Sequence, residues 1–224
     1  MVITIRIMEL EIGKNKMDKR EDFKNSYYNG FKTLFPNLTE EEFMGYYDES
    51  IYGGYPEEPS GSIWESEGKS IYVLIRVLKP KSILEIGNYK GRSTNHILQA
   101  VEKNNVGNVT LVDIEERLEF DNLHNKKFSR IINDSLLYLN NEMSYDLIIQ
   151  DGNHEYHHVK KELELILNNN KNDEYIIWGH DYHKTIIGVC EVNKAVNELK
   201  DNFQHVIPMI DSVSNCGIVL ISKK

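Results

Sequence analysis

The stretch that decides the fold runs from residue 82 to residue 93 and reads Ser82-Ile-Leu-Glu-Ile-Gly-Asn-Tyr-Lys-Gly-Arg-Ser93. Its first half is a short apolar run, which predicts a buried strand. Gly87 ends the run and Gly91 follows, so the chain can turn tightly and bring its backbone close to a ligand where a helix begins. Ordinary strand-to-helix turns also use spaced glycines. The stretch therefore predicts a strand followed by a helix, and the glycines alone do not indicate a binding site.

Strands and helices alternate around this stretch. A helix before it presents Ile71, Leu74, Ile75 and Leu78 on one face and stops at Pro80. Further strands are predicted at 109–113, 129–133, 145–151 and 175–178, with helices between them, and two closing strands at 205–210 and 216–222. Alternation predicts an α/β fold with a doubly wound, mostly parallel, seven-stranded, Rossmann-like sheet. Because no helix separates the closing strands, the final strand should be antiparallel.

The chain divides into an N-terminal segment, 1–62, and a larger domain, 63–224. The segment is polar and rich in tyrosine. Its predicted elements are a short strand or arm at the start, helices near 19–35 and 39–47, and a Gly- and Pro-rich loop at 53–61. Thr39 and Glu42 predict a capping box for the second helix. We expect this N-terminal helical segment to form a lid or a subunit contact, the latter in a homo-oligomer.

Composition limits the classes of function. The 224 residues fit one large domain, and 26 basic against 35 acidic residues give a net charge of −9. An acidic chain is a poor partner for nucleic acid. Two cysteines, Cys190 and Cys216, make neither a disulfide framework nor a Cys-rich zinc site, which fits a reduced cytoplasmic compartment. We find no signal peptide and no apolar run of about 20 residues, so no membrane partner is expected.

Acidic residues stand at the predicted strand ends, where doubly wound sheets bind their ligands. Glu85 lies at the end of the first strand. Asp113 ends the second strand, 26 positions after Gly87, and is the type of residue that takes ribose hydroxyls in nucleotide-binding sheets. Asp134 follows the third strand and has two interpretations: it accepts a hydrogen bond from an exocyclic amino group, or it caps the helix that begins beside it.

A dehydrogenase is one alternative. Its fingerprint is Gly-x-Gly-x-x-Gly, followed about 20 residues later by an acidic residue. Here Tyr89 stands where the middle glycine would be. A side chain at that point would crowd a pyrophosphate, so the loop favours a ligand without phosphates.

Residues 85–93, Glu-Ile-Gly-Asn-Tyr-Lys-Gly-Arg-Ser, resemble the glycine loop of class I S-adenosylmethionine-dependent methyltransferases, closest to the catechol O-methyltransferase-like branch. Residues 145–156 and 176–182 resemble the metal-dependent small-molecule O-methyltransferases that modify sugars and natural products. The resemblance covers about residues 62–222. It implies methylation of a hydroxyl on a small sugar, phenol or natural product, with S-adenosylmethionine and a divalent cation as cofactors, Mg²⁺ first and Mn²⁺ or another ion second.

The resemblance also implies site residues. The cofactor-binding residues are Glu85, Gly87, Tyr89, Gly91, Ser93, Asp113, Asp134, Ser135 and Asp151. The metal residues are Asp151, His180 and Asp181, although relatives often carry an acidic residue at position 180, which changes the preferred ion. His154 stands where the family carries a general base, a lysine in the catechol enzymes. An imidazole with its ordinary pKa of about 6.5 suits proton removal at neutral pH.

The histidines support other interpretations. Residues 154–158, His-Glu-Tyr-His-His, contain the His-Glu-x-x-His pattern of zinc proteases. The pattern begins directly after a strand, so its two rings would not share one helical face. His157 and His183 are expected to be exposed. Metal-dependent hydrolysis or hydroxylation at 154–158 and 180–183, or cofactor binding without turnover, stay open as alternatives.

Overall fold

The computed structural model describes residues 19–51, 63–118, 128–183, 191–212 and 217–223. Seven strands form one sheet in the order β3-β2-β1-β4-β5-β7-β6. The strands are β1 (Ser82–Ile86), β2 (Asn108–Asp113), β3 (Phe128–Ile132), β4 (Leu147–Gln150), β5 (Ile176–His180), β6 (His205–Met209) and β7 (Ile218–Ser222). The pairs among β1 to β5 are parallel, and β7 is antiparallel to both its neighbours. The predicted α/β sheet with an antiparallel last strand is confirmed.

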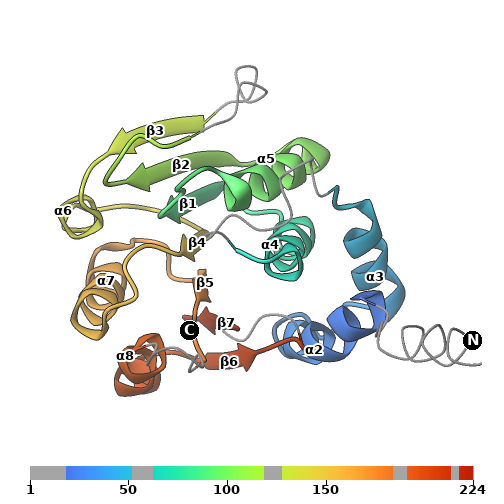
Figure 1. The fold of residues 1–224 in the computed structure, drawn as a ribbon. Coiled ribbons are helices and arrows are strands. Elements are labelled where there is room, and N and C mark those ends of the chain that lie inside the picture. Colours follow the sequence, from blue (N-terminus) through green and yellow to red (C-terminus); the bar gives the residue numbers. More distant parts are fainter. Residues whose placement is uncertain (1–18, 52–62, 119–127, 184–190, 213–216, 224) are drawn as a thin grey trace, which may run out of the picture.

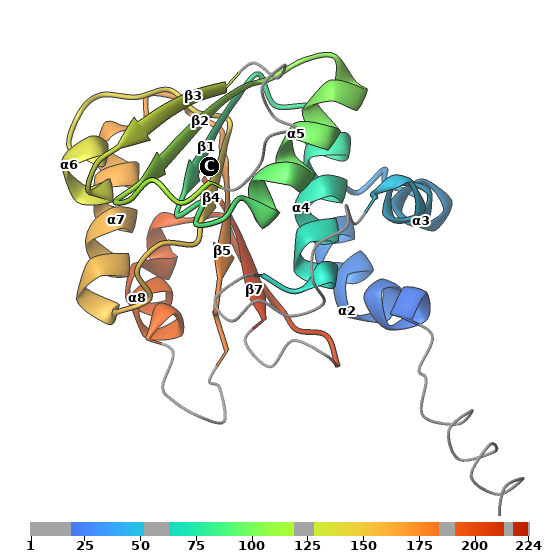
Figure 2. The ribbon, with the colours of Figure 1, turned by 45° about the horizontal axis from the view of Figure 1, so that its top comes forward.

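Helices cover both faces of the sheet (Figure 1). They are α2 (Lys19–Leu34), α3 (Glu40–Glu49), α4 (Glu65–Leu78), α5 (Arg92–Asn104), α6 (Ser135–Leu139), α7 (Tyr156–Asn169), α8 (Val192–Leu199) and the 3₁₀ turn η2 (Lys200–Asn202). Figure 2 shows α4 and α5 on one face, with α2 and α3 outside them, and α6, α7 and α8 on the other. Each face buries its own apolar cluster against the sheet. The residues that follow β1 to β5 line a cavity.

The described N-terminal helices are part of the core. Phe23, Tyr27, Phe31 and Phe43 are buried in the cluster that also holds α4 and α5. Tyr27 donates a hydrogen bond of 2.9 Å to Asp211, which follows β6. This packing fixes α2 and α3 to the larger domain, and their role as a lid or a subunit contact stays a prediction. The predicted arm at the start and the loop at 53–61 lie outside the described residues.

Local sequence explains the ends of two elements. The predicted capping box is confirmed, because Thr39 accepts from Glu42 N while the Glu42 carboxylate accepts from Thr39 N. Pro208 is tolerated because β6 is an edge strand, where one backbone N–H does not enter the sheet. The fifth strand was predicted to end at Trp178, but it continues to His180. Pairing with β7 carries the strand these two residues further and sets His180 at its carboxyl end.

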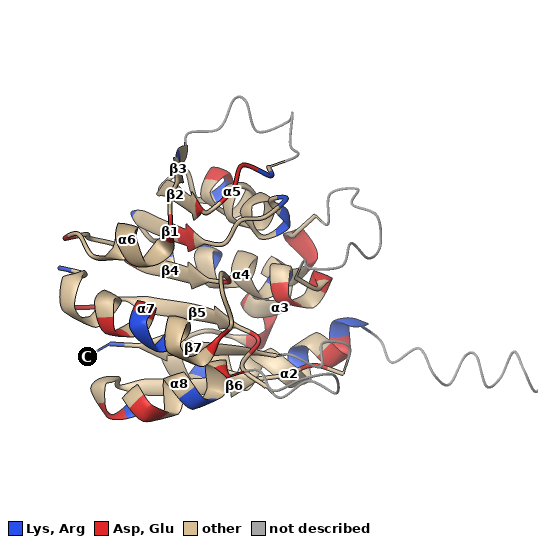
Figure 3. Ribbon diagram, turned by 60° about the vertical axis from the view of Figure 1, so that its left-hand side comes forward, with Lys and Arg blue, Asp and Glu red and all other residues tan. Residues whose placement is uncertain are grey.

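The outer helices have mixed charge. Figure 3 shows basic and acidic positions together on α7 and α8. Lys160 on α7 and Glu198 on α8 form an ion pair of 3.0 Å between the two helices. In the described part of the chain, we find no helix whose length and apolar character would let it cross a membrane.

Candidate functional site

A cavity of about 810 Å³ opens at the carboxyl ends of the strands. This volume is in the range of small-molecule sites, and the position is where doubly wound sheets bind ligands. Its walls come from the loops after β1 to β5 and from the residues that precede α4. The sequence-predicted residues on the wall are Gly87, Tyr89, Ser93, Asp113, Asp134, Ser135, Asp151, His154, His180 and Asp181. The topology therefore gathers most of the predicted site in one cavity.

Two glycines shape the loop after β1. Gly87 has a φ of +81°, and a Cβ atom there would lie 2.2 Å from the carbonyl oxygen of Asp151. Only glycine allows β1 and the chain after β4 to approach this closely. Gly91 has a φ of +90° and is the N-cap of α5, but it does not line the cavity. Both glycines thus allow backbone conformations with a positive φ, and their contact with a cofactor stays a prediction.

Asp113 organises the same loop. Its Oδ2 accepts from the backbone N–H groups of Asn88, at 2.9 Å, and Tyr89, at 2.8 Å. Its Oδ1 accepts from Glu115 N at 3.1 Å. Asn88 was missed in the sequence, yet its buried amide lines the cavity and makes no hydrogen bond to any residue that the structure describes. A buried amide without a partner fits a polar ligand at this point.

Glu85 lies behind the cavity wall. Its fully buried carboxylate accepts hydrogen bonds from Ser93 and, at 2.6 Å, from Thr94. Burial raises its pKa to about 8, and the two hydroxyls only partly oppose that shift. Glu85 does not lie among the wall residues and holds the first turn of α5, and its contact with a cofactor stays a prediction. Ser93 is on the wall but gives its hydroxyl proton to Glu85.

The residues after β3 have structural partners. Asp134 caps α6, because its Oδ1 accepts from the backbone N–H of Leu136 at 2.7 Å. The capping interpretation of Asp134 is therefore confirmed, and its contact with an adenine amino group stays a prediction. Ser135 donates to Glu162 at 2.5 Å and lies 3.0 Å from His158 Nε2. Asp134 and Ser135 both remain on the cavity wall.

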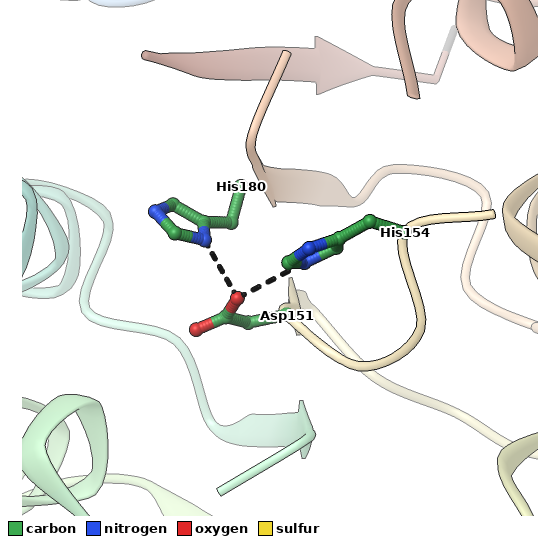
Figure 4. A group of neighbouring side chains, drawn as sticks. All are labelled: Asp151, His154 and His180. Atoms are coloured by element: carbon green, nitrogen blue, oxygen red, sulfur yellow. Dashed lines mark ion pairs between the residues drawn. The ribbon is translucent and has the colours of Figure 1, made fainter. Parts of the chain in front are cut away.

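Four side chains from the ends of β4 and β5 meet at one side of the cavity, and we call them the Asp–His cluster: Asp151, His154, His180 and Asp181. Figure 4 shows His154 and His180 pointing toward Asp151. His180 Nδ1 lies 2.8 Å, and His154 Nε2 3.3 Å, from Asp151 Oδ1. His154 Nδ1 lies 2.8 Å from Asp181 Oδ2. Ligand atoms of Asp151, His154 and His180 all lie within 4.8 Å of one another, which fits a single metal ion.

Electrostatic interactions between the members of the Asp–His cluster shift their pKa values. Burial opposes charging throughout, yet the two imidazoles lower the pKa of Asp151. Burial likewise opposes protonation of His154, but the neighbouring carboxylates of Asp151 and Asp181 raise its pKa to about 9. The pKa of His180 is raised well above its ordinary value by Asp151 and Glu67, against the effect of burial. The ordinary imidazole pKa expected for His154 is therefore wrong for the protein without a bound cation.

Glu67 was missed in the sequence. This carboxylate on α4 is completely buried, and its Oε2 lies 3.0 Å from His180 Nε2. The same oxygen accepts from Trp64 N at 2.8 Å. Trp178 stacks on the His180 ring, with centroids 5.8 Å apart and planes inclined by 6°. The position of Glu67 three residues after Trp64 was a signal for a helix start, but nothing local linked it to His180.

The zinc-protease arrangement is absent from residues 151–183. Helix α7 begins at Tyr156, so His154 precedes the helix as expected. His158 Nε2 faces Ser135 and Glu162 instead of the His154 ring. His157 is exposed as expected, whereas His183 is half-buried. Within the described residues, Asp151, His154 and His180 form the only group of three His, Cys, Asp or Glu side chains close enough to share a metal ion.

Comparisons with known proteins agree with this fold. Residues 84–182 match a family model described as a methyltransferase domain. No curated protein matches the chain. One similar solved structure is the O-methyltransferase TomG from Streptomyces achromogenes, which is involved in tomaymycin synthesis and was solved in complex with SAM. Its sequence is 15% identical to this chain, and the TM-score is 0.57, with 93% of this chain and 99% of TomG covered. An O-methyltransferase from Bacillus cereus in complex with SAH is 14% identical, with a TM-score of 0.56 over 89% and 98%.

Proposed function

The chain contains a methyltransferase domain on the class I methyltransferase fold. On this basis we propose that it transfers the methyl group of S-adenosylmethionine to a hydroxyl of a small molecule such as a sugar, a phenol or a natural product. One observation carries the proposal. The glycine loop and Asp113 share a single cavity with the Asp–His cluster. A methyl donor held by the first group would thus lie next to residues able to activate a hydroxyl.

The cofactor side of the cavity fits this donor. The backbone of the loop at 87–89 is hydrogen-bonded to Asp113, whose carboxylate lies on the wall with the Asn88 amide, which has no hydrogen-bond partner among the described residues. A carboxylate accepts hydrogen bonds from the ribose hydroxyls, and a buried amide can pair with a polar group of the cofactor. Asp134 and Ser135 lie at the far end of the same wall and would face the adenine. Binding here fixes the donor in place, and positioning is the main contribution an enzyme makes to a displacement at carbon.

The acceptor side fits a divalent cation. Asp151, Asp181 and His180 would hold it, with His154 beside them, and they offer oxygen and imidazole ligands. When bound, such a cation makes a coordinated hydroxyl easier to deprotonate and orients it. Glu67 fixes the His180 ring from behind, as a carboxylate commonly does for a metal-ligating histidine.

His154 is the proposed general base. Its ring lies between the two carboxylates, 2.8 Å from Asp181 and 3.3 Å from Asp151, and lines the cavity. It lies on the loop before α7, with about a third of its side chain exposed, so its ring can turn to meet an acceptor. In its neutral form it would take the hydroxyl proton at a ring nitrogen, and the neighbouring carboxylates would stabilise the imidazolium.

Two solved relatives support the reaction class. TomG and the Bacillus cereus protein are both named O-methyltransferases, and their structures hold SAM and SAH respectively. The test is transfer of labelled methyl from S-adenosylmethionine to a panel of phenols and sugars, with and without exhaustive chelation. We expect cofactor binding in both conditions and transfer only with a cation. Binding without transfer to any acceptor would support a non-catalytic module, and transfer that survives chelation would show that the reaction needs no cation.

A further inference from the structure

We propose that His180, oriented by Glu67, makes this site bind a divalent first-row metal between iron and zinc in preference to Mg²⁺. The inference rests on the proposed function, because it concerns the cation of the same site. It adds the identity of the metal and assigns His180 as the residue that determines it. Three observations carry it: the rigidity of the His180 ring, the direction of its Nδ1 atom and the composition of the donor set.

The His180 ring has little freedom to move away from the cluster. It is about 10% exposed, it lies at the end of a fully buried strand, and the indole of Trp178 stacks on it. Trp178 is itself fixed, since its indole N–H donates to Ser70 on α4 at 3.0 Å. A cation that binds Asp151 therefore meets the His180 ring and cannot displace it easily.

Glu67 sets which nitrogen faces the cation. An ionised carboxylate only accepts hydrogen bonds, so Glu67 holds the proton on His180 Nε2, 3.0 Å away. The Nδ1 atom is then the ligand atom, and it lies 2.8 Å from Asp151 Oδ1. Metal-ligating histidines commonly place their second nitrogen on a carboxylate in this way. The pair is thus built to present a neutral imidazole to a metal.

The donor set disfavours Mg²⁺. Magnesium prefers oxygen ligands in a near-octahedral arrangement and keeps several of its waters. Here the fixed Nδ1 atom of His180 lies 2.8 Å from Asp151 Oδ1, so a cation bound to that carboxylate meets an imidazole nitrogen. Imidazole ligands suit Zn²⁺, Fe²⁺ and Ni²⁺, whose affinity for nitrogen exceeds that of the alkaline-earth ions.

His180 and His154 have separable roles. The His180 side chain is about 10% exposed and bound to Glu67, whereas that of His154 is about 31% exposed and lies beside the carboxylates of Asp151 and Asp181. Hence His180 is the permanent ligand, and His154 is the residue free to exchange a proton. The cation selectivity should follow the residue at position 180 and not that at 154.

The test uses the purified full chain after chelator treatment, with Co²⁺ as a visible-absorption probe and Zn²⁺ and Mg²⁺ as competitors. We expect Co²⁺ to bind with the spectrum of a nitrogen-containing site, Zn²⁺ to displace it, and a large molar excess of Mg²⁺ to leave it bound. The variant His180→Glu should weaken Co²⁺ binding about tenfold or more and make Mg²⁺ an effective competitor. His157→Ala, at an exposed position on α7, is the control and should behave as the wild type.

A glutamate at position 180 would face Glu67, so the double variant Glu67→Gln/His180→Glu provides a second test without that repulsion. Displacement of Co²⁺ by Mg²⁺ in the wild type, or no Co²⁺ binding at all, would overturn the inference. Calorimetric titration with S-adenosylhomocysteine on the same samples separates the two claims. Cofactor binding without cation selectivity leaves the proposed function standing, and cation selectivity without cofactor binding contradicts the proposed function alone.

Discussion

Glu67 and His180 are 113 positions apart in the chain, yet Glu67 Oε2 lies 3.0 Å from His180 Nε2 in a buried contact. The same oxygen accepts a hydrogen bond from the backbone N–H of Trp64, which lines the cavity. One carboxylate therefore joins three parts of the molecule: the start of α4, the cavity wall and the end of β5. Any change at Glu67 should reach the Asp–His cluster through the His180 ring.

Replacing Glu67 tests this link. We expect Glu67→Ala to lower cation affinity by about 10–100-fold, because His180 loses the group that orients it. Glu67→Gln keeps a hydrogen-bond acceptor and should restore part of the loss, which a purely structural role would not explain. Co²⁺ titration measures the affinity, and circular dichroism checks the fold. Glu65→Gln, in the first turn of the same helix, is the control. A folded Glu67→Ala protein with normal affinity would show that Glu67 does not position His180.

His154→Ala tests the general base. The expected result is a fall in kcat of about 100-fold or more with cofactor affinity nearly unchanged, because the ring acts only in proton transfer. Burial opposes protonation, but Asp151 and Asp181 raise the pKa of His154 to about 9. At limiting cation, the wild-type rate should therefore rise with pH toward 9, and the variant should lack this rise. Exposed His157→Ala serves as control. Near-normal kcat with the wild-type pH profile would exclude His154 from the chemistry.

Gly87→Ala and Gly45→Ala form a matched pair. An alanine Cβ at position 87, where φ is +81°, would lie 2.2 Å from the Asp151 carbonyl, whereas at position 45 on α3 it meets nothing within 4 Å. We expect Gly87→Ala to lower the free energy of unfolding by more than about 1 kcal/mol. Gly45→Ala should raise it by about 0.4–1 kcal/mol, because alanine favours a helix. Urea denaturation measures both, and equal effects would refute the close approach of β1 to the chain after β4.

Glu85→Gln tests the buried carboxyl. Burial raises the pKa of Glu85 to about 8 in the folded chain, from an ordinary value of 4.5. Between pH 4.5 and pH 8 the folded state therefore binds more protons than the unfolded state. The contribution of Glu85 to stability is complete below about pH 4.5 and is lost as pH rises through 8. Glutamine stays neutral and should flatten that part of the pH dependence. Urea denaturation between pH 5 and 8 provides the measurement, and an identical slope in the variant would show that Glu85 is ionised throughout.

Apolar periodicity was enough to predict the sheet, because each buried strand is a short continuous apolar run with a helix or turn after it. In the structure β4 pairs with β5, which brings Asp151 and Asp181 together. The end of β5 was placed two residues early, since Gly179 and His180 are not strand formers by themselves. Their pairing partners in β7 supply what the local sequence lacks.

The surroundings of the site were less predictable. The contact between Glu67 and His180 depends on how α4 packs on the sheet, which no local pattern encodes. Asn88 lies inside the quoted loop, but what distinguishes it is a buried side-chain amide without a hydrogen-bond partner in the described part of the chain. Glu85, an acidic residue near a strand end, was expected to bind the cofactor, and in the structure its carboxylate accepts hydrogen bonds from Ser93 and Thr94. A carboxylate serves a helix start and a ligand equally well, and only the structure distinguishes the two.

Calorimetric titration of the purified chain with S-adenosylmethionine tests the central claim most directly, because it requires no knowledge of the acceptor. We expect one saturable site per chain, with affinity reduced about tenfold or more in Asp113→Asn through loss of a charged hydrogen-bond acceptor. Asp201→Asn, at an exposed position in η2, should bind as the wild type does. Absence of saturable binding in the wild type, or equal affinity in a folded Asp113→Asn protein, would contradict the assignment of this cavity to S-adenosylmethionine.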